Sequence, residues 1–389
     1  MSNIFGFSSS KLEELGATYT ATEVYQQPRL WEEAIRYIKE NESNFAKFMN
    51  KVLATPNLNI VLTGAGTSAY VGDTIYSHIE TATKVPTFAI ATTDIVSNPD
   101  NFIKKETPYL LVSFARSGNS PESVAAYNLF EQKADTVYQL VITCNKDGAL
   151  AKKASSTDKG LLMLMPEESN DKSFAMTSSF TCMMLSALLM FELGNLENNA
   201  KTFEEVIANG KNILDNNWEE IKSISDLGYD RIVYLGSGAL AGLCKEMALK
   251  NLELTSGKYI TVCESVLGFR HGPKSIINDR TLIVFLTSTN EYTHLYDFDL
   301  IKEVYTDNGE QKVITLDYMN RENLREISDT YMNSKGSQVA DAFAAFNYIL
   351  FGQIFALFNA INLAISPDNP RPDGTVNRVV QGVIIHEAN

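Results

Sequence analysis

The stretch that decides the fold is residues 60–66, IVLTGAG, which recurs at residues 232–238 as IVYLGSG. Each copy is a run of strand-forming apolar residues that ends in two glycines and leads into a helical pattern. The copies are 172 residues apart, and two further pairs of apolar runs share that spacing: 111–112 with 283–284, and 141–143 with 313–315. Three coincidences at one spacing predict a duplicated unit in which parallel strands alternate with helices.

The remaining apolar runs extend this pattern over most of the chain. We expect strands at 60–63, 109–114, 137–144, 161–165, 232–235, 259–263, 282–286 and 313–316. The sequence therefore predicts an α/β protein with two tandem domains, each a parallel sheet between two layers of helices. The predicted parts are an N-terminal helical arm over 1–49 with a helix at 21–50, a first domain over 50–205, a second over 206–366 and an irregular C-terminal tail over 367–389, where prolines end the last helix.

Composition and charge exclude several classes of protein. A chain of 389 residues with 44% hydrophobic and 21% charged residues is globular and long enough for two domains. Its net charge of −14 argues against nucleic-acid and membrane partners. Four separated cysteines and the absence of a secretory pattern in residues 1–16 indicate reduced thiols and a cytoplasmic location. Residues 342–366 are uncharged, but their four amide side chains favour a helix buried in a core or a subunit interface over a membrane span.

Two loops that follow predicted strands combine glycines with hydroxyl groups. Residues 64–68, GAGTS, and 115–121, ARSGNSP, each precede a helix, where backbone N–H groups and hydroxyls favour a small anion such as phosphate. Neither loop is a dinucleotide fingerprint or a P-loop. The alternatives are that the glycines only form tight turns and that Ser120 only caps the helix that begins at Pro121. The second half has Thr289 and Asn290 in place of Ser117 and Gly118, so we expect only the first half to bind phosphate.

A helix and a turn in the second half carry candidate catalytic groups. Lys250 and Glu253 are three residues apart on one helix face, and the alternative is a solvated ion pair. His271 precedes Gly272-Pro273, which fixes a turn. A carboxylate and a histidine are sufficient to open a sugar ring and move a proton beside a carbonyl. No cofactor is expected, and no metal, because the histidines and cysteines lack ligand spacing.

Together these motifs resemble proteins of the sugar isomerase (SIS) domain family, in the tandem arrangement of the isomerase half of glucosamine-6-phosphate synthase. Residues 170–181 and 374–382 are most similar to the bacterial branch of tagatose-6-phosphate ketose/aldose isomerases and galactosamine-6-phosphate deaminases. The resemblance implies two tandem SIS domains. It assigns phosphate binding to Thr67, Ser68, Arg116, Ser117 and Ser120, hydroxyl binding to Ser173, proton transfer to Glu253, ring opening to His271 and charge stabilisation to Lys250.

The implied reaction is deaminating isomerisation of an amino-sugar phosphate, from galactosamine 6-phosphate to tagatose 6-phosphate and ammonia. The implied assembly is a homodimer in which His271 reaches the neighbouring subunit's site, with the uncharged helix at 342–366 as an apolar surface for the dimer. Two alternatives stay open, an isomerase that releases no ammonia and a non-catalytic sugar-phosphate sensor, as does the choice between galacto and gluco substrates. The synthase's C-terminal lysine, which can form a Schiff base, has no lysine counterpart in this chain. The nearest residue is Arg378, which stays protonated and cannot be that nucleophile.

Overall fold

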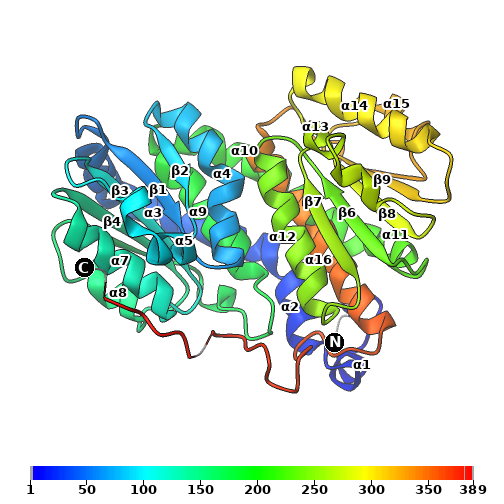
Figure 1. The fold of residues 1–389 in the computed structure, drawn as a ribbon, viewed down its shortest axis with the longest axis horizontal. Helices are drawn as coiled ribbons and strands as arrows, with labels where there is room; N and C mark the ends of the chain where they lie inside the picture. Colours follow the sequence, from blue (N-terminus) through cyan, green and yellow to red (C-terminus); the bar gives the residue numbers. More distant parts are fainter. Residues whose placement is uncertain (1–2, 381, 388–389) are drawn as a thin grey trace. The chain divides into compact units, whose positions relative to one another are not determined.

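Two parallel β-sheets of five strands each form the centre of the structure, a computed structural model that describes residues 3–380 and 382–387 (Figure 1). The first sheet has the strand order β2-β1-β3-β4-β5, and the second, read in the same sense, has the order β7-β6-β8-β9-β10. The two orders correspond strand by strand when β1 is matched with β6. This confirms the predicted α/β fold with a duplicated sheet.

The chain forms two compact units, and each is described by itself. The unit around the first sheet, called the N-sheet unit, comprises residues 29–172 and 176–200 and the described part of 373–389. The unit around the second sheet, called the C-sheet unit, comprises the described part of 1–28 together with 173–175 and 201–372. The N-terminal helices thus belong to the C-sheet unit, and the C-terminal tail belongs to the N-sheet unit.

The N-sheet unit has helices on both faces of its sheet (Figure 1). Its strands are β1 (Asn59–Thr63), β2 (Thr87–Ala89), β3 (Tyr109–Ala115), β4 (Val137–Thr143) and β5 (Gly160–Leu164). Its helical segments are α3 (Gln27–Leu53), α4 (Thr67–Thr83), α5 (Thr92–Ser97), α6 (Pro99–Phe102), α7 (Pro121–Lys133), α8 (Ala149–Ala154), η1 (Glu167–Ser169), α9 (Ser178–Phe191), η2 (Leu193–Asn195) and the start of α10 (Leu196–Asn212). Helix α4 packs against α9, whereas α7 packs against α5 and α8. Every residue of β3 is buried, as expected for the central strand of a covered parallel sheet.

The C-sheet unit repeats this layered arrangement. Its strands are β6 (Arg231–Leu235), β7 (Ile260–Glu264), β8 (Thr281–Leu286), β9 (Lys312–Asp317) and β10 (Thr330–Asn333). Its helical segments are α1 (Ser9–Leu15), α2 (Thr18–Tyr25), the π-helical turn η3 (Ile213–Asn217), α11 (Trp218–Ser225), α12 (Ala239–Leu254), α13 (Val266–Phe269), η4 (Pro273–Ile276), α14 (Glu291–Thr306), α15 (Glu322–Arg325) and α16 (Asp341–Asn362). Helix α12 packs against β6, β7 and α16, and α14 packs against β9 and α13.

All eight predicted strands are present, and the ends of each lie within one residue of the predicted ends. The pairing of the strands tests whether the 172-residue spacing joins equivalent positions. Ile60 lies opposite Leu110, and Ile232 lies opposite Leu282, so the first two coincidences reflect equivalent positions. The third pair, 141–143 with 313–315, does not occupy equivalent positions, so this part of the prediction is wrong. Leu110 lies opposite Tyr138 whereas Leu282 lies opposite Lys312, which places β9 174 residues after β4. A shift of two residues keeps each side chain on the same face of the strand, so the apolar pattern matches at either spacing.

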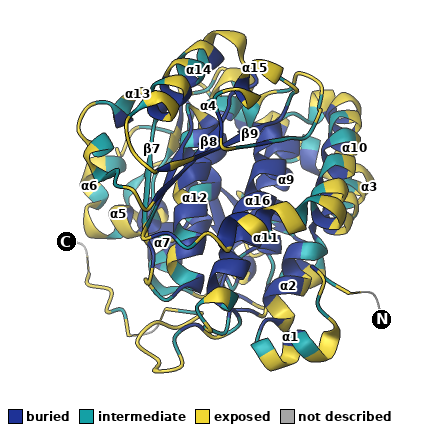
Figure 2. Cartoon of the chain, turned by 90° about the vertical axis from the view of Figure 1, so that its right-hand side faces the viewer, coloured by how far each residue is buried: buried dark blue, intermediate teal, exposed yellow. Residues whose placement is uncertain are grey.

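The predicted helix at 21–50 is two helices, α2 and α3, and Pro28 is the second residue of α3. Helix α16 is the one described helix long and apolar enough to cross a membrane, and 94% of its apolar window is buried (Figure 2). Its amide groups are hydrogen-bonded inside the C-sheet unit, since Gln353 accepts from Gln27 and Asn359 donates to Asn251. The core prediction is confirmed. The expectation that this helix offers a dimer surface is wrong, because α2, α11 and α12 cover it.

Candidate active site

A pocket of about 480 Å³, here called the serine pocket, lies at the carboxyl ends of β1 and β3 in the N-sheet unit. This is the edge at which open parallel sheets bind ligands. Ser68, in the first turn of α4, lines one side, and the loop between β3 and α7 contributes Arg116, Ser117 and Ser120. The structure therefore brings together four of the five predicted phosphate-binding residues. Thr67 is buried next to Ser68 but does not line the pocket.

Glycines give both loops the shape that forms this pocket. Gly66, immediately before α4, has φ of 55°, and Gly118, between the two serines of the second loop, has φ of 67°. A Cβ atom on Gly64 would lie 2.5 Å from the backbone of Ser68. Only glycine fits these positions without strain. The same glycines thus form the tight turns and shape the loops that carry Ser68, Ser117 and Ser120.

Ser120 is the residue before α7, as predicted, but its side chain does not cap the helix. Its hydroxyl instead donates to Ser123 Oγ at 2.6 Å, so the predicted capping hydrogen bond is absent. Ser123 also lines the pocket and is 4% exposed. Ser123 was not among the predicted residues, although it follows Ser120 by three residues, the spacing that places two residues on one helix face.

The C-terminal tail supplies part of the pocket wall through Arg378, Val379 and Val380. The guanidinium of Arg116 donates to the backbone carbonyl of Arg378 at 2.7 Å. The guanidinium of Arg378 donates to the backbone carbonyl of Asp171. The Asp171 carboxylate accepts backbone N–H groups at the start of α9, so the tail is tied to an element of the N-sheet unit. The Arg378 guanidinium is therefore bound to a protein carbonyl oxygen.

In the C-sheet unit, two carboxylates of the chain itself accept the hydrogen bonds that the equivalent loop donates. Thr289, the counterpart of Ser117, donates its backbone N–H to Asp341 at 2.7 Å and its hydroxyl to Asp341 at 2.9 Å. Ser288 donates its hydroxyl to Asp341 at 2.6 Å and its backbone N–H to Asp297 at 2.7 Å. These donors are already used, which gives a physical reason why an external anion would bind the first half and not the second.

Lys250 and Glu253 lie on α12 of the C-sheet unit and are not a solvated pair. The Lys250 side chain is completely buried, with Nζ 2.6 Å from Glu253 Oε2 and 3.3 Å from Glu246 Oε1. The Glu246 side chain is also completely buried, whereas that of Glu253 is 26% exposed. Burial alone would lower the pKa of Lys250, but the two carboxylates outweigh it and raise the pKa above its ordinary value. Lys250 is therefore a fixed cation that orients a partly accessible carboxylate.

The two remaining predicted residues have different settings in the C-sheet unit. His271 is exposed, and Gly272 after it has φ of 126°, which closes the turn at the end of α13. Ser173 is completely buried. Its N–H donates to the Glu23 carboxylate at 3.2 and 3.3 Å, and its hydroxyl donates to the carbonyl of Ala175 at 2.9 Å. Ser173 does not line the serine pocket.

Comparison with known proteins adds to this geometry. The SIS domain model matches residues 53–193. The D-galactosamine-6-phosphate deaminase AgaS of Shewanella sp. (strain ANA-3) is 42% identical to the chain and covers 97% of it and 94% of its own length. The solved tagatose-6-phosphate ketose/aldose isomerase of Escherichia coli has a TM-score of 0.89 at 38% identity over 98% of both chains. A solved Clostridium novyi NT protein, provisionally assigned the same activity, has a TM-score of 0.97 at 45% identity over 100% of both chains.

Proposed function

The chain belongs to the SIS-domain family, in its branch of galactosamine-6-phosphate deaminases and tagatose-6-phosphate isomerases, and we propose that it converts galactosamine 6-phosphate and water into tagatose 6-phosphate and ammonia. The observation that carries the proposal is the 42% identity to a D-galactosamine-6-phosphate deaminase along 97% of the chain. The serine pocket of the N-sheet unit and the buried Lys250–carboxylate cluster of the C-sheet unit supply the kinds of groups that this reaction needs.

The serine pocket is the proposed phosphate site. Ser68, Ser117, Ser120 and Ser123 offer hydroxyl donors, and Arg116 adds a guanidinium. Hydrogen bonds to a charged group contribute about 1.5 to 3 kcal/mol each, which is enough for a local site to bind an anion within a protein of net charge −14. We also propose that Thr67 binds the phosphate through its backbone at the start of α4. Ser173 is proposed to contact a substrate hydroxyl.

Glu253 is the proposed proton-transferring group. In the open-chain substrate, its carboxylate removes the C2 proton while the C1 aldehyde oxygen is protonated, which gives an enolamine. It then returns the proton to C1 while the nitrogen loses one proton, which leaves a C1 alcohol and a ketimine at C2. Water then adds to the ketimine carbon, the C–N bond breaks, and ammonia and the ketose phosphate are released. Lys250 orients the carboxylate and places a positive charge beside the charge that develops in the transition state.

His271 is the proposed ring-opening group, and we propose that it acts in the site of a second copy of the chain. Its exposure fits such a role. Mixing an inactive Glu253→Gln chain with an inactive His271→Asn chain should restore about a quarter of wild-type activity, because half of the dimers are mixed and each mixed dimer has one complete site. Subunit exchange without restored activity would mean that each chain builds its own site. We also propose that the enzyme is cytoplasmic, in keeping with the wide separation of its four cysteines along the sequence.

A substrate panel tests the proposed function. Galactosamine 6-phosphate, glucosamine 6-phosphate and the 2-hydroxy sugar galactose 6-phosphate should be compared for ammonia and ketose phosphate. The proposal predicts ammonia from the amino sugars, with galactosamine 6-phosphate preferred. Ketose phosphate from galactose 6-phosphate alone would support the isomerase that releases no ammonia. Binding without turnover of any sugar would support the sensor.

A further inference from the structure

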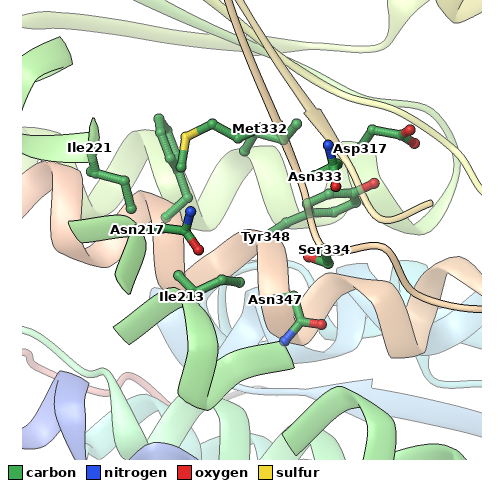
Figure 3. Close-up of a pocket in the computed structure, with 11 residues that line it drawn as sticks. Ile213, Asn217, Ile221, Asp317, Met332, Asn333, Ser334, Asn347 and Tyr348 are labelled. Atoms are coloured by element: carbon green, nitrogen blue, oxygen red, sulfur yellow. The ribbon is translucent and has the colours of Figure 1, made fainter. Parts of the chain in front are cut away.

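The C-sheet unit contains a pocket at the carboxyl ends of β9 and β10, next to α16 (Figure 3). It has space for only about one or two water molecules. Buried water is sufficient for the amide oxygens of Asn333 and Asn347, which have no hydrogen-bond partner among the described residues. A sugar does not fit there. The feature of this unit that bears on the proposed reaction is instead the surface turn that carries His271.

The His271 turn, residues 270–274, has a hydrogen-bonded backbone. The N–H of His271 donates to the carbonyl of Gly268 at 2.9 Å, and the N–H of Ser275 donates to the carbonyl of Gly272 at 3.0 Å. Within the part of the chain that the structure describes, no side chain is hydrogen-bonded to the His271 imidazole. The direction of the imidazole therefore depends on how firmly the turn is held.

Glu303, on α14, binds the His271 turn on both sides of the histidine. Its Oε2 accepts a hydrogen bond from Arg270 Nε at 2.8 Å, and its Oε1 accepts one from Lys274 Nζ at 2.6 Å. Asp307 adds a second carboxylate, with Oδ2 2.7 Å from Lys274 Nζ. The hydrogen bond from Lys274, together with that from Arg270, outweighs burial and lowers the pKa of Glu303 below its ordinary value. Glu303 is therefore an ionised link between the two sides of the turn.

The two carboxylates lie where they do not favour α14 by itself. Glu303 is in the last turn of the helix and Asp307 follows its final residue, and the helix dipole disfavours negative charge at this end. Positive groups are favoured there, and Arg270 and Lys274 supply them. The carboxylates thus serve the contact with the turn. Because they neutralise both cations, Arg270 and Lys274 are poor candidates for binding a substrate phosphate.

Apolar contacts fix the two ends of the His271 turn. Phe269, just before the turn, is completely buried in the same core cluster as Val304 of α14, and Ile276, just after it, packs against that cluster. The turn therefore has anchored ends and an accessible middle. Glu303 connects the two sides of this middle part.

We propose that Glu303 is a positioning residue for His271, which holds both sides of the turn so that the imidazole keeps one direction toward the substrate ring. The inference rests on the ring-opening role proposed for His271. In ring opening the C1–O5 bond breaks, O1 loses a proton and O5 gains one, and an imidazole can accept the first proton and donate the second. Such transfer requires heavy-atom separations of about 2.6 to 3.2 Å, so a turn that moves more freely lowers the rate.

Hydrogen exchange of the full chain, followed by mass spectrometry, tests the positioning without any substrate. Glu303→Ala removes both acceptors from the turn and keeps a good helix former. The backbone amides of His271 and Ser275 should then exchange about three- to tenfold faster, because a partly exposed ion pair contributes a factor of about five or less to a local opening equilibrium. Unchanged exchange in Glu303→Ala would overturn the proposal.

The matched control for this experiment is Asp226→Ala. Asp226 ends α11 in the same unit, and its partly exposed carboxylate also has two partners, Lys222 at 2.6 Å and Asn362 at 3.0 Å. Its loss should leave the exchange of His271 and Ser275 at the wild-type rate. Equal acceleration in Asp226→Ala would mean a general loosening of the unit and would overturn the proposal.

Ammonia release from galactosamine 6-phosphate shows whether the positioning acts through His271. Glu303→Ala should lower kcat about three- to tenfold with a smaller change in KM, and Asp226→Ala should match the wild type. In a His271→Asn background, where no imidazole remains to be positioned, Glu303→Ala should change the residual rate less than about twofold.

The same kinetics separate failure of this inference from failure of the proposed function. A His271→Asn enzyme as fast as the wild type would refute the ring-opening role of His271 and the inference with it. A slow His271→Asn enzyme with Glu303→Ala at the wild-type rate would overturn the positioning role alone. Equal losses from Glu303→Ala in both backgrounds would show that Glu303 acts on the fold and not through His271, and would also overturn it.

Discussion

Replacing Lys250 with methionine should destabilise the C-sheet unit by about 3 to 5 kcal/mol, the usual cost of removing one partner from a buried ion pair. The Nζ–carboxylate distances of 2.6 and 3.3 Å correspond to about 6 and 5 kcal/mol of Coulomb attraction at an effective dielectric constant of about 20. Desolvation of the buried charges offsets part of this energy, and water screens the partly exposed Glu253. Most of the loss therefore comes from Glu246, which stays completely buried without its cation.

The double variant Lys250→Met/Glu246→Gln should recover most of that loss, because it removes both members of the buried pair. Urea unfolding followed by tryptophan fluorescence measures the effect. The chain has two tryptophans, and in a Trp31→Phe background Trp218 reports on the C-sheet unit. The raised pKa of Lys250 makes its contribution complete below pH 10.5 and lost as the pH rises through the folded-state pKa. A single variant within about 1 kcal/mol of the wild type, or a double variant no more stable than the single, would refute this reasoning.

Three further predictions follow from the two sheets. Ser117→Ala and Ser120→Ala should each raise KM about tenfold or more, with a smaller change in kcat, because each removes a hydrogen-bond donor to the phosphate. Steady-state kinetics measures this effect, and an unchanged KM would contradict the phosphate site. Asp341→Ser frees the hydrogen-bond donors of Ser288 and Thr289 in the C-sheet unit. Phosphate titration followed by ³¹P NMR should therefore give two sites per chain in the variant and one in the wild type. One site in both proteins would contradict the interpretation that Asp341 prevents anion binding at this loop. Burial raises the pKa of Asp297 to about 7, so the contribution of this group to stability is complete below pH 3.8 and lost as the pH rises through 7. Urea unfolding should show that the free energy of unfolding of Asp297→Asn, relative to the wild type, rises by up to about 4 kcal/mol between pH 4 and 8. A difference in unfolding free energy that does not change with pH would contradict this prediction.

The sequence pattern predicted most strands because each central strand is buried on both faces and forms an uninterrupted apolar run. It missed β2 and β10, which have three and four residues and lie at the edges of their sheets. Each has a single buried residue, and its other residues are exposed or partly exposed, so neither strand gives an apolar run or an alternating pattern. The two-residue shift of β9 also escaped detection, because a pattern with a period of two is blind to such a shift.

The candidate site was predictable where its residues follow strands or share a helix face. Ser117 and Ser120 come from one loop. Glu246 lies four residues before Lys250 on α12, and this spacing places the two residues on one helix face. The contact between Arg116 and Arg378 joins residues 262 positions apart. No local pattern carries such a contact, because only the folded chain brings the tail to the pocket.

The most direct test of the proposed reaction is the ratio of ammonia to tagatose 6-phosphate formed from galactosamine 6-phosphate in a single time course. The proposed reaction requires equal amounts of the two products at every time point. It also predicts that Glu253→Gln, which keeps the size of the side chain but cannot accept the proton, lowers both rates together by about 10² to 10⁴. Ketose phosphate formed without ammonia, or ammonia release that persists at the wild-type rate in Glu253→Gln, would rule out the proposed reaction.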